Sequence, residues 1–324
     1  MHSKGRVDES LVSPQDLEAL LASVASRSGD SRSGLFGPES ISWRIDRESA
    51  LFLGAGRAAL LQLAHPWVAA ALVDHSNLLK DPIARFHNTF RVVFTMIFGT
   101  REQAFRSSRR LYALHARIRG ELPEGVGRYP RNSHYEANEI SALRWVFATL
   151  VESGLIAYEC VLPPLTADER EQYYAESKTT AALFGIPERA LPSDWTAFTA
   201  YCEEMVRSDG LGVSDQARVL GQNLLRGAGS RVRPPHWYRA LTVWWMPSRL
   251  RNEFGFDLND SDRRAAARAL RWLPRAYRRL PRALRFVGPY REAECRLGGR
   301  AIDATVLWSN RFWIGQSRLL AEEE

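Results

Sequence analysis

The sequence predicts an all-α protein, a single large multi-helix domain with no significant sheet. Apolar residues recur at helical spacing through most of the chain, whereas strand-like alternation of apolar and polar residues is scarce. No repeat of fixed period is visible, which argues against a solenoid. The length of 324 residues exceeds that of a typical domain, but one large core is compatible with it.

The first 40 residues are predicted to form one helix and a flexible linker. Ser13 and Pro14 are a capping hydroxyl and a first-turn proline, a pair that favours a helix start. The apolar residues that follow have helical spacing: Leu17, Leu20, Leu21 and Val24. The range 26–37 is rich in Ser and Gly and is the predicted linker.

Four further helices are predicted in the first half of the chain, over the ranges 47–64, 67–73, 82–98 and 101–119. Pro66 ends the first of them, because proline cannot continue a helix. Asp81 and Pro82 start the third, and Gly99 stops it. Gly120 closes the fourth, which is predicted to be one long helix with arginines in its last turn.

The second half is predicted to continue with helices over 138–158, 166–185, 193–208, 214–226, 236–254 and 261–285. Thr166 and Glu169 form a capping box at the start of one of these helices. Pro274, Pro281 and Pro289 predict that the C-terminal region consists of several short helices, because each proline interrupts a helix.

Composition argues against several classes of protein. No run of eighteen apolar residues exists and no secretory signal is recognisable, so we expect no transmembrane helix and a cytoplasmic location. Cys160, Cys202 and Cys295 are far apart and in no C-x-x-C pattern, which argues against a disulfide framework and against structural zinc.

The net charge of +7 is distributed unevenly. Residues 261–300 contain twelve arginines against three acids, Asp262, Glu292 and Glu294. Such a segment can meet nucleic acid, anionic lipid or water. Because no zinc-finger, homeodomain or RNA-binding signature accompanies it, we expect no nucleic-acid binding and a solvated basic face, with peripheral membrane contact left open.

One short motif imitates a dinucleotide site. Gly54, Gly56 and Ala59 match G-x-G-x-x-A, and Asp74 follows twenty residues after the first glycine. A dinucleotide fold needs a strand before the glycines and an uninterrupted helix after them, but Pro66 cuts this helix and no strand–helix alternation follows. We therefore interpret the glycines as small residues that let another helix or a ligand approach the backbone closely.

The seven histidines form neither an H-E-x-x-H nor an E-x-x-H motif, so catalytic zinc and a carboxylate-bridged di-iron centre lack ligands. A haem site needs only one strong axial ligand and is therefore compatible with the sequence. His115 is the best candidate for this metal ligand, because the apolar Leu111, Leu114 and Ile118 surround it. Arg119 is predicted to share its helix face four residues later and to balance a haem propionate.

A second set of polar residues lies on the preceding helix. Arg85 and Thr89 are four residues apart and share a face, with Asn88 on the adjacent flank. A guanidinium, an amide and a hydroxyl on one surface are the groups that a distal haem pocket would use to hold dioxygen, although an interhelical polar network would show the same spacing. Three aromatic residues are predicted to line this pocket: Phe86, Phe90 and Trp145.

At these residues the chain resembles the haem-dependent oxygenase family that includes the MpaB-type oxygenase and the catalytic domain of rubber oxygenase (latex-clearing protein). The resemblance covers about residues 40–290. It rests on Leu60-Leu61-Gln62-Leu63-Ala64-His65-Pro66, Asp74-His75-Ser76, Arg85-x-x-Asn88-Thr89, Leu114-His115 with Gly120, and Trp145-Val146-x-x-Thr149-Leu150-Val151. The resemblance implies an all-helical fold of the MpaB/rubber oxygenase type that binds haem b through one axial histidine, His115.

One departure from the family pattern bears on the reaction. The rubber-cleaving members carry R-x-x-K-T at the distal side, whereas Asn88 replaces the lysine in this chain. Lysine can bind iron or act as a charged acid or base, while asparagine only donates and accepts neutral hydrogen bonds. The departure argues against polyisoprene cleavage but not against haem binding. His65 and His75 belong to family motifs, and the proline and serine that follow them favour structural roles.

The sequence therefore predicts an oxidoreductase, a haem b-dependent oxygenase that uses dioxygen, or alternatively peroxide, on a small apolar substrate. The resemblance implies that this substrate contains an alkene and is isoprenoid in character. His115 is the expected iron ligand, Arg85, Asn88 and Thr89 are the expected catalytic residues, and Arg119 and Arg85 are expected to contact the haem. A non-catalytic haem carrier or sensor and a cofactor-free helical scaffold that docks on membranes are the alternatives.

Three parts of the chain are predicted. Residues 1–40 hold the first helix and the linker, and residues 41–290 form the haem-binding, oxygenase-like domain. Residues 291–324 are an extension that packs on the core or on a partner chain, so that oligomer formation stays open.

Overall fold

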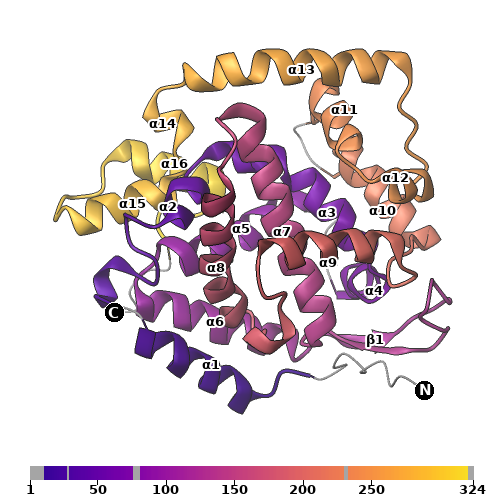
Figure 1. Cartoon of the computed structure of the whole chain (residues 1–324), viewed down its shortest axis with the longest axis horizontal. Coiled ribbons are helices and arrows are strands. Elements are labelled where there is room, and N and C mark those ends of the chain that lie inside the picture. The colour runs from indigo at the N-terminus through magenta and orange to yellow at the C-terminus, as the bar shows by residue number, and fades with distance from the viewer. Residues whose placement is uncertain (1–10, 28, 76–80, 230–232, 320–324) are drawn as a thin grey trace.

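Helices make up almost all of the regular structure (Figure 1). The computed structural model describes residues 11–27, 29–75, 81–229 and 233–319. The α-helices of this part of the chain are α1 (Pro14–Arg27), α2 (Ile41–Asp46), α3 (Ala55–Leu63), α4 (Pro66–His75), α5 (Pro82–Phe98), α6 (Arg101–His115), α7 (Ile140–Val161), α8 (Ala167–Leu183), α9 (Trp195–Arg207), α10 (Asp215–Arg226), α11 (His236–Trp244), α12 (Ser248–Glu253), α13 (Asp260–Arg278), α14 (Arg282–Arg285), α15 (Gly288–Leu297) and α16 (Ala304–Ile314).

Short elements complete the architecture. They are the 3-10 helices η1 (Ser31–Ser33), η2 (Ser49–Leu53) and η3 (Glu188–Ala190) and the strands β1 (Arg119–Glu121) and β2 (His134–Glu136). The two strands pair antiparallel and form the one sheet of the described residues. The prediction of an all-α protein with no significant sheet is confirmed.

Helix α7 is the centre of the core. Thirteen of its 22 residues are buried, and α3, α8, α13 and η2 pack around it. By length and composition α7 is also the one described helix that is apolar enough to cross a membrane, but 61% of its apolar window is buried inside the protein. A helix that is apolar on all sides and covered by other helices is typical of a protein core. In Figure 1, α7 runs through the middle of the molecule.

Helices α5 and α6 form a hairpin joined by only two residues, Gly99 and Thr100. The Thr100 hydroxyl accepts a hydrogen bond from the Gln103 amide at 3.2 Å, and the Gln103 side chain accepts one from the Thr100 amide at 2.9 Å. This capping box starts α6 directly after the loop. Because the connection is so short, residues equally far from the loop lie opposite each other on the two antiparallel helices.

The C-terminal helices α15 and α16 pack against α5. The rings of Trp313 and Phe52 stack with centroids 3.9 Å apart, and Phe52 also contacts Phe86 and Phe90 of α5. On the same side, His87 Nε2 lies 3.0 Å from the carbonyl oxygen of Phe312. The extension that follows the predicted domain therefore packs on the core.

The N-terminal helix α1 lies against α6 and α8 and buries Leu17, Leu21 and Val24. Within the described part of the predicted linker, Arg32 of η1 and Arg296 of α15 exchange two hydrogen bonds between side chain and carbonyl oxygen, at 3.3 and 3.0 Å. The three-part division of the chain and the flexibility of the linker stay predictions.

The helix predicted over 47–64 is wrong in its first half, because tertiary contacts override the local pattern. The chain forms η2, and α3 begins only at Ala55. The Glu48 carboxylate is 1% exposed and accepts two hydrogen bonds from Arg285, at 2.7 and 2.8 Å, which bends the backbone toward the C-terminal region. A methyl group on Gly54 would overlap the Ser153 carbonyl oxygen of α7, so the first glycine of the G-x-G-x-x-A motif permits a close helix approach.

The helix predicted over 101–119 ends at His115, four residues early. The Ile118 amide donates to the His115 carbonyl oxygen at 2.9 Å, and Arg119 then begins β1, where it pairs with Glu136. Ile118 packs beside Tyr129 in a small apolar cluster, and this cluster together with the β-pairing turns the chain out of the helical path.

Two further predictions are wrong, and a proline is involved in each. The range 236–254 contains two helices, α11 and α12, because Pro247 separates them. Conversely, Pro274 lies inside α13 and does not end it. A proline removes one backbone hydrogen bond from a helix, but the buried Leu273 and Tyr277 on either side hold α13 against the core.

Candidate functional site

The α5–α6 hairpin brings Arg85 and His115 together. Arg85 lies about as far before the Gly99–Thr100 loop as His115 lies after it, so the hairpin places the two residues opposite each other. The electrostatics agree, because the positive charge of Arg85 lowers the pKa of His115, an effect that weakens with distance. The structure thus joins the two residues that the sequence singled out; their chemical roles stay predictions.

His115 is the last residue of α6 and is half-buried. Burial, followed by the charge of Arg85, lowers the pKa of its imidazole to about 4, while a hydrogen bond with the Asn138 side chain acts in the opposite direction. A helix C-terminus by itself favours a protonated histidine, so burial and Arg85 outweigh the helix dipole here. At neutral pH the imidazole is therefore uncharged, which is the form that binds metals.

Asn138 was not anticipated from the sequence as part of this site. It is buried, and its Nδ2 donates to the carbonyl oxygen of Tyr112 on α6 at 3.3 Å. This bond holds the amide beside the last turn of α6, where it reaches His115. The contact between Asn138 and His115 cannot be predicted from local sequence, because the β-hairpin separates the two residues along the chain.

The Arg85 side chain is exposed, yet its guanidinium is surrounded by protein atoms that exclude much of the water. Its side chain keeps a large solvent-accessible area, yet burial among surrounding atoms lowers its pKa. Both observations hold if the guanidinium lines a concave surface, where protein surrounds it and one side stays open. No carboxylate within the described ranges forms an ion pair with Arg85, so its charge is uncompensated by this part of the protein.

The other two polar residues of α5 have local partners. Asn88 Oδ1 accepts a hydrogen bond from Arg91 at 2.7 Å, and the Thr89 hydroxyl donates to the Arg85 carbonyl oxygen at 3.0 Å. The Asn88 amide nitrogen and the lone pairs of the Thr89 hydroxyl remain available to a ligand. Thr89 lies one helical turn from Arg85 on the same face, as the spacing predicts.

Arg119 does not share a helix face with His115, because it belongs to β1. The predicted reason for its role is therefore wrong, although its exposed side chain stays close to His115 along the chain. The Arg119 carbonyl oxygen lies 3.1 Å from His75 Nε2, so the end of α4 reaches the same region.

His65 has no path to solvent. It is 1% exposed, and its Nε2 lies 3.2 Å from the Tyr129 hydroxyl oxygen. Burial, followed by the positive charge of Arg128, lowers the pKa of His65 to about 3. Its surroundings are those of a packed core histidine, which supports the structural role expected for it.

Three large apolar side chains near the ends of α4, α5 and α6 are exposed. Val73 lies near the end of α4, Ile83 near the start of α5 and Leu114 next to His115 at the end of α6. Apolar surface of this kind often marks a ligand or partner site. A flat apolar group beside His115 would cover surface that the described residues leave open.

The three aromatic residues predicted to line the pocket lie in different places. Phe86 and Phe90 pack on Phe52, and Trp145 is buried in the core, where its Nε1 donates to the Leu61 carbonyl oxygen at 2.8 Å. Phe90 also lines a largely apolar cavity of about 90 Å³ between α2, α3, α5, α7 and α8. That volume is below the roughly 300–1,000 Å³ of typical ligand sites.

A buried carboxyl group in this cavity was missed by the sequence reasoning. Asp46 accepts a hydrogen bond from the Tyr173 hydroxyl at 3.1 Å. Burial raises the pKa of Asp46 to about 7, against the effect of that hydrogen bond, and the charge of Glu176 adds to the rise. No local motif distinguishes Asp46 from a surface acid, because its burial depends on α5, α7 and α8.

The described residues offer no group of three or more His, Cys, Asp or Glu that could hold a metal ion by themselves. A non-haem iron site of the two-histidine, one-carboxylate type therefore lacks its ligands in this part of the chain. A single accessible imidazole is sufficient where the bound group supplies the other metal ligands.

Comparison with known proteins gives one match. A family model described as "ER-bound oxygenase mpaB/B'/Rubber oxygenase, catalytic domain" matches residues 43–279. The matched range includes Arg85, Asn88, Thr89, His115 and Arg119 and ends before α14. No curated protein and no solved structure matches the chain.

Proposed function

The chain belongs to the family of MpaB and rubber oxygenase catalytic domains, which marks it as an oxygenase, and from this premise we propose that it binds haem b and oxygenates a small apolar substrate. The match itself supports an oxygenase, and the proposal adds haem b and the residues that would hold it. The observation that carries it is the pairing of a neutral, half-buried His115 with the uncompensated charge of Arg85.

The residues present fit haem b. His115 offers an uncharged imidazole next to the exposed Leu114, and Asn138 positions the ring from one side. Val73, Ile83 and Leu114 are exposed apolar side chains that would contact the macrocycle, and the exposed Arg119 would pair with a haem carboxylate. When bound, haem b supplies the redox-active iron that dioxygen chemistry requires.

The remaining residues act by charge and hydrogen bonding. Arg85 would donate charge-assisted hydrogen bonds to an anionic group held between the two helices. Thr89, one turn away, would orient the same group through its hydroxyl. Asn88 already accepts from Arg91 and carries no titratable proton, so it cannot replace a lysine as an acid or base. We therefore propose an alkene-containing, isoprenoid-like substrate other than polyisoprene.

Absorption spectroscopy tests the cofactor. The purified protein, after haem supplementation, should show a Soret band that His115→Ala abolishes. His134→Ala is the matched control, because His134 has 82% of its side chain exposed on β2 and should leave the band unchanged. A wild type without a Soret band, or equal loss in both variants, would refute the proposal.

Oxygen consumption separates an oxygenase from the alternative of a haem carrier or sensor. For the haem-loaded wild type, uptake of dioxygen should rise when an isoprenoid alkene is added, and Arg85→Met should remove most of this rise. Uptake that stays at the same rate with every alkene tested would favour the carrier.

Helix α13 supports a second proposal, peripheral contact with an anionic membrane. At successive spacings of three and four residues, five exposed arginines form one outward row: Arg264, Arg268, Arg271, Arg275 and Arg278. Arg268, Arg275 and Arg278 donate to backbone carbonyl oxygens of the same helix, and none of the five arginines pairs with a carboxylate of the described ranges. In Figure 1, α13 lies at the outer edge of the molecule.

Vesicle sedimentation tests this contact. Each arginine near an anionic surface contributes about 1 kcal/mol, so changing Arg264, Arg268 and Arg271 to glutamine should weaken binding to phosphatidylserine vesicles by about a hundredfold. The control changes three exposed arginines elsewhere, Arg189, Arg207 and Arg226, and should bind as the wild type does. Equal binding by both triple variants, or binding that does not fall with salt, would contradict the contact. Truncation before α13 is a poor test, because α13 packs on α11 and α7.

A further inference from the structure

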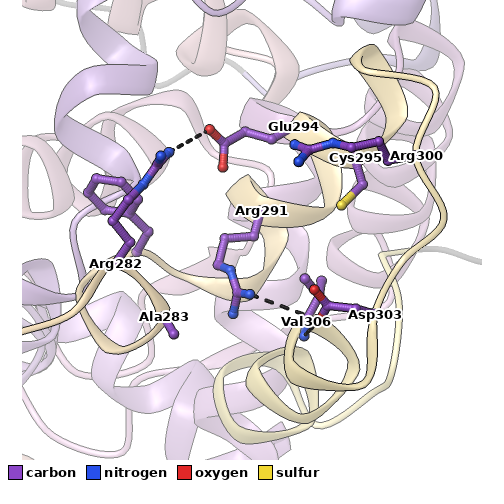
Figure 2. A pocket seen from close by; sticks show the side chains of 9 residues that line it. Arg282, Ala283, Arg291, Glu294, Cys295, Arg300, Asp303 and Val306 are labelled. Carbon is purple, nitrogen blue, oxygen red and sulfur yellow. Dashed lines mark hydrogen bonds and ion pairs between the residues drawn. The ribbon is translucent and has the colours of Figure 1, made fainter.

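A pocket of about 340 Å³ lies between α14, α15 and α16, C-terminal to the residues that match the oxygenase family (Figure 2). Its volume is in the range of small-molecule sites, roughly 300–1,000 Å³. The residues that line it are Arg282, Ala283, Phe286, Arg291, Glu294, Cys295, Arg300, Asp303 and Val306. The pocket is therefore separate from the Arg85–His115 site in sequence and in its helices.

Arg291 lies at the centre of this pocket (Figure 2). Only 16% of its side chain is exposed, Nη2 donates to the Thr305 hydroxyl at 2.6 Å, and the Asp303 carboxylate is 4.0 Å away. Nη1 is buried and has no hydrogen-bond partner among the described residues. A buried guanidinium nitrogen without a partner is unfavourable, and an anionic ligand would supply the missing acceptor.

Two more arginines border the pocket. Arg282 donates to the Glu294 carboxylate at 2.9 Å, as the dashed line in Figure 2 shows. Arg300 is exposed, and its side chain forms no ion pair with a described carboxylate. Its backbone amide donates to the Cys295 carbonyl oxygen at 2.9 Å, which holds Arg300 at the rim.

The charges of the lining do not cancel. The lining contains three guanidinium groups and two carboxylates, Glu294 and Asp303, so its formal charge is positive. The sequence just before the pocket adds positive charge, because residues 263–291 contain eight arginines besides Arg282 and Arg291 and no acid. A dianion is therefore better matched to the pocket than a monoanion. Phe286, Ala283 and Val306 give the same pocket an apolar wall.

We propose that this pocket binds the phosphate group of a phosphate monoester, with Arg291 and Arg300 as its main donors and the apolar wall against the organic part. Planar guanidinium groups match phosphate oxygens through paired hydrogen bonds. The phosphate group can belong to a free small molecule or to a lipid headgroup, and the recognising chemistry is the same in both.

Isothermal titration of the full chain with glycerol 3-phosphate tests the proposal. We expect saturable binding at one site and a loss of about tenfold or more in affinity for Arg291→Gln and for Arg300→Gln, since each removes charge-assisted hydrogen bonds. Arg300→Gln changes an exposed side chain and so preserves folding. The matched control is Arg226→Gln, an exposed arginine of α10 outside the pocket, which should bind as the wild type does.

Two further measurements test which kind of molecule carries the phosphate group and whether the pocket prefers phosphate to a carboxylate. Binding to vesicles that contain phosphatidic acid, lost in Arg300→Gln and kept in Arg226→Gln, would assign the pocket to a lipid headgroup. Acetate at equal concentration should compete weakly. The proposal is overturned if no saturable binding to either phosphate is found, if acetate binds as tightly, or if the Arg226 variant loses as much affinity as the pocket variants.

Discussion

Replacing Arg85 with methionine tests whether α5 and α6 hold a cation against His115. Methionine keeps much of the length of the side chain and removes its charge. In the structure, burial is the larger cause of the low pKa of His115, about 4, and Arg85 is the second cause. Removing the guanidinium should therefore raise the pKa of His115 but leave it below the usual 6.5.

The size of the change follows from Coulomb's law. For two unit charges about 8 Å apart in a medium with an effective dielectric constant of about 40, the repulsion is about 1 kcal/mol. This corresponds to a pKa rise of about 0.8 for the imidazole. The functional consequence has a definite sign: since only neutral histidine binds a metal, haem release on acidification should begin at a higher pH in the variant.

The assay is an NMR titration of the histidine ring signals of haem-free protein between about pH 3 and 8, a range that brackets the usual pKa. Loss of one signal in His115→Gln assigns the resonance. Arg91→Met is the control, because Arg91 lies on the same helix, is bound to Asn88 and does not contribute to the pKa of His115. An unchanged pKa in the Arg85 variant, or the same rise in the control, would refute the opposed placement of Arg85 and His115.

Three more variants test the packing around the site. Asp46→Asn should unfold at a higher urea concentration than wild type at pH 8 but not at pH 4. The raised pKa of the Asp46 carboxyl group gives the wild type stability that is complete below about pH 3.8 and is lost as the pH rises through about 7. The free energy of unfolding that is lost in this way is at most about 4 kcal/mol. Gly54→Ala should lose about 1–3 kcal/mol in urea unfolding, because its methyl group meets the Ser153 carbonyl oxygen, whereas Gly29→Ala, with open space around it, should change little. Glu48→Gln should lower the unfolding free energy by about 3–5 kcal/mol, because it breaks a buried ion pair, and a loss below about 1 kcal/mol would show that this pair does not hold the bend before α3.

The sequence predicted elements whose signals lie within a few neighbouring residues. Pro14 and Pro82 mark the first residues of α1 and α5, and the Thr166 capping box starts α8. Gly99 follows the last residue of α5. Each of these signals acts on backbone groups in the adjacent turn, so it holds whatever the rest of the chain does.

Predictions failed where distant contacts decide the local conformation. The bend at Glu48 depends on Arg285, and the end of α6 depends on pairing with β2. Pro274 stays helical because the core holds both flanks of α13. In each case the free energy of tertiary packing exceeds the modest differences in local propensity.

The candidate site shows the same division. Its two principal residues, Arg85 and His115, were recognisable from spacing and from the family motifs, because both signals lie within a few neighbouring residues. The role of Asn138, the exposed apolar side chains and the position of Arg119 in a strand could not be predicted from the sequence. They depend on how the β-hairpin and α4 pack near the end of α6.

By itself, the sequence determined the helical class and the family, and it singled out one histidine and one arginine as candidate site residues. Only the tertiary structure decided that this histidine is neutral, that Asp46 is buried in a cavity, and that Arg291 lies in a pocket with a donor unsatisfied. The physical reason is that periodicity and capping are properties of neighbouring residues. Protonation and unmet hydrogen bonds, by contrast, depend on the loss of water, which only residues distant in the chain can bring about.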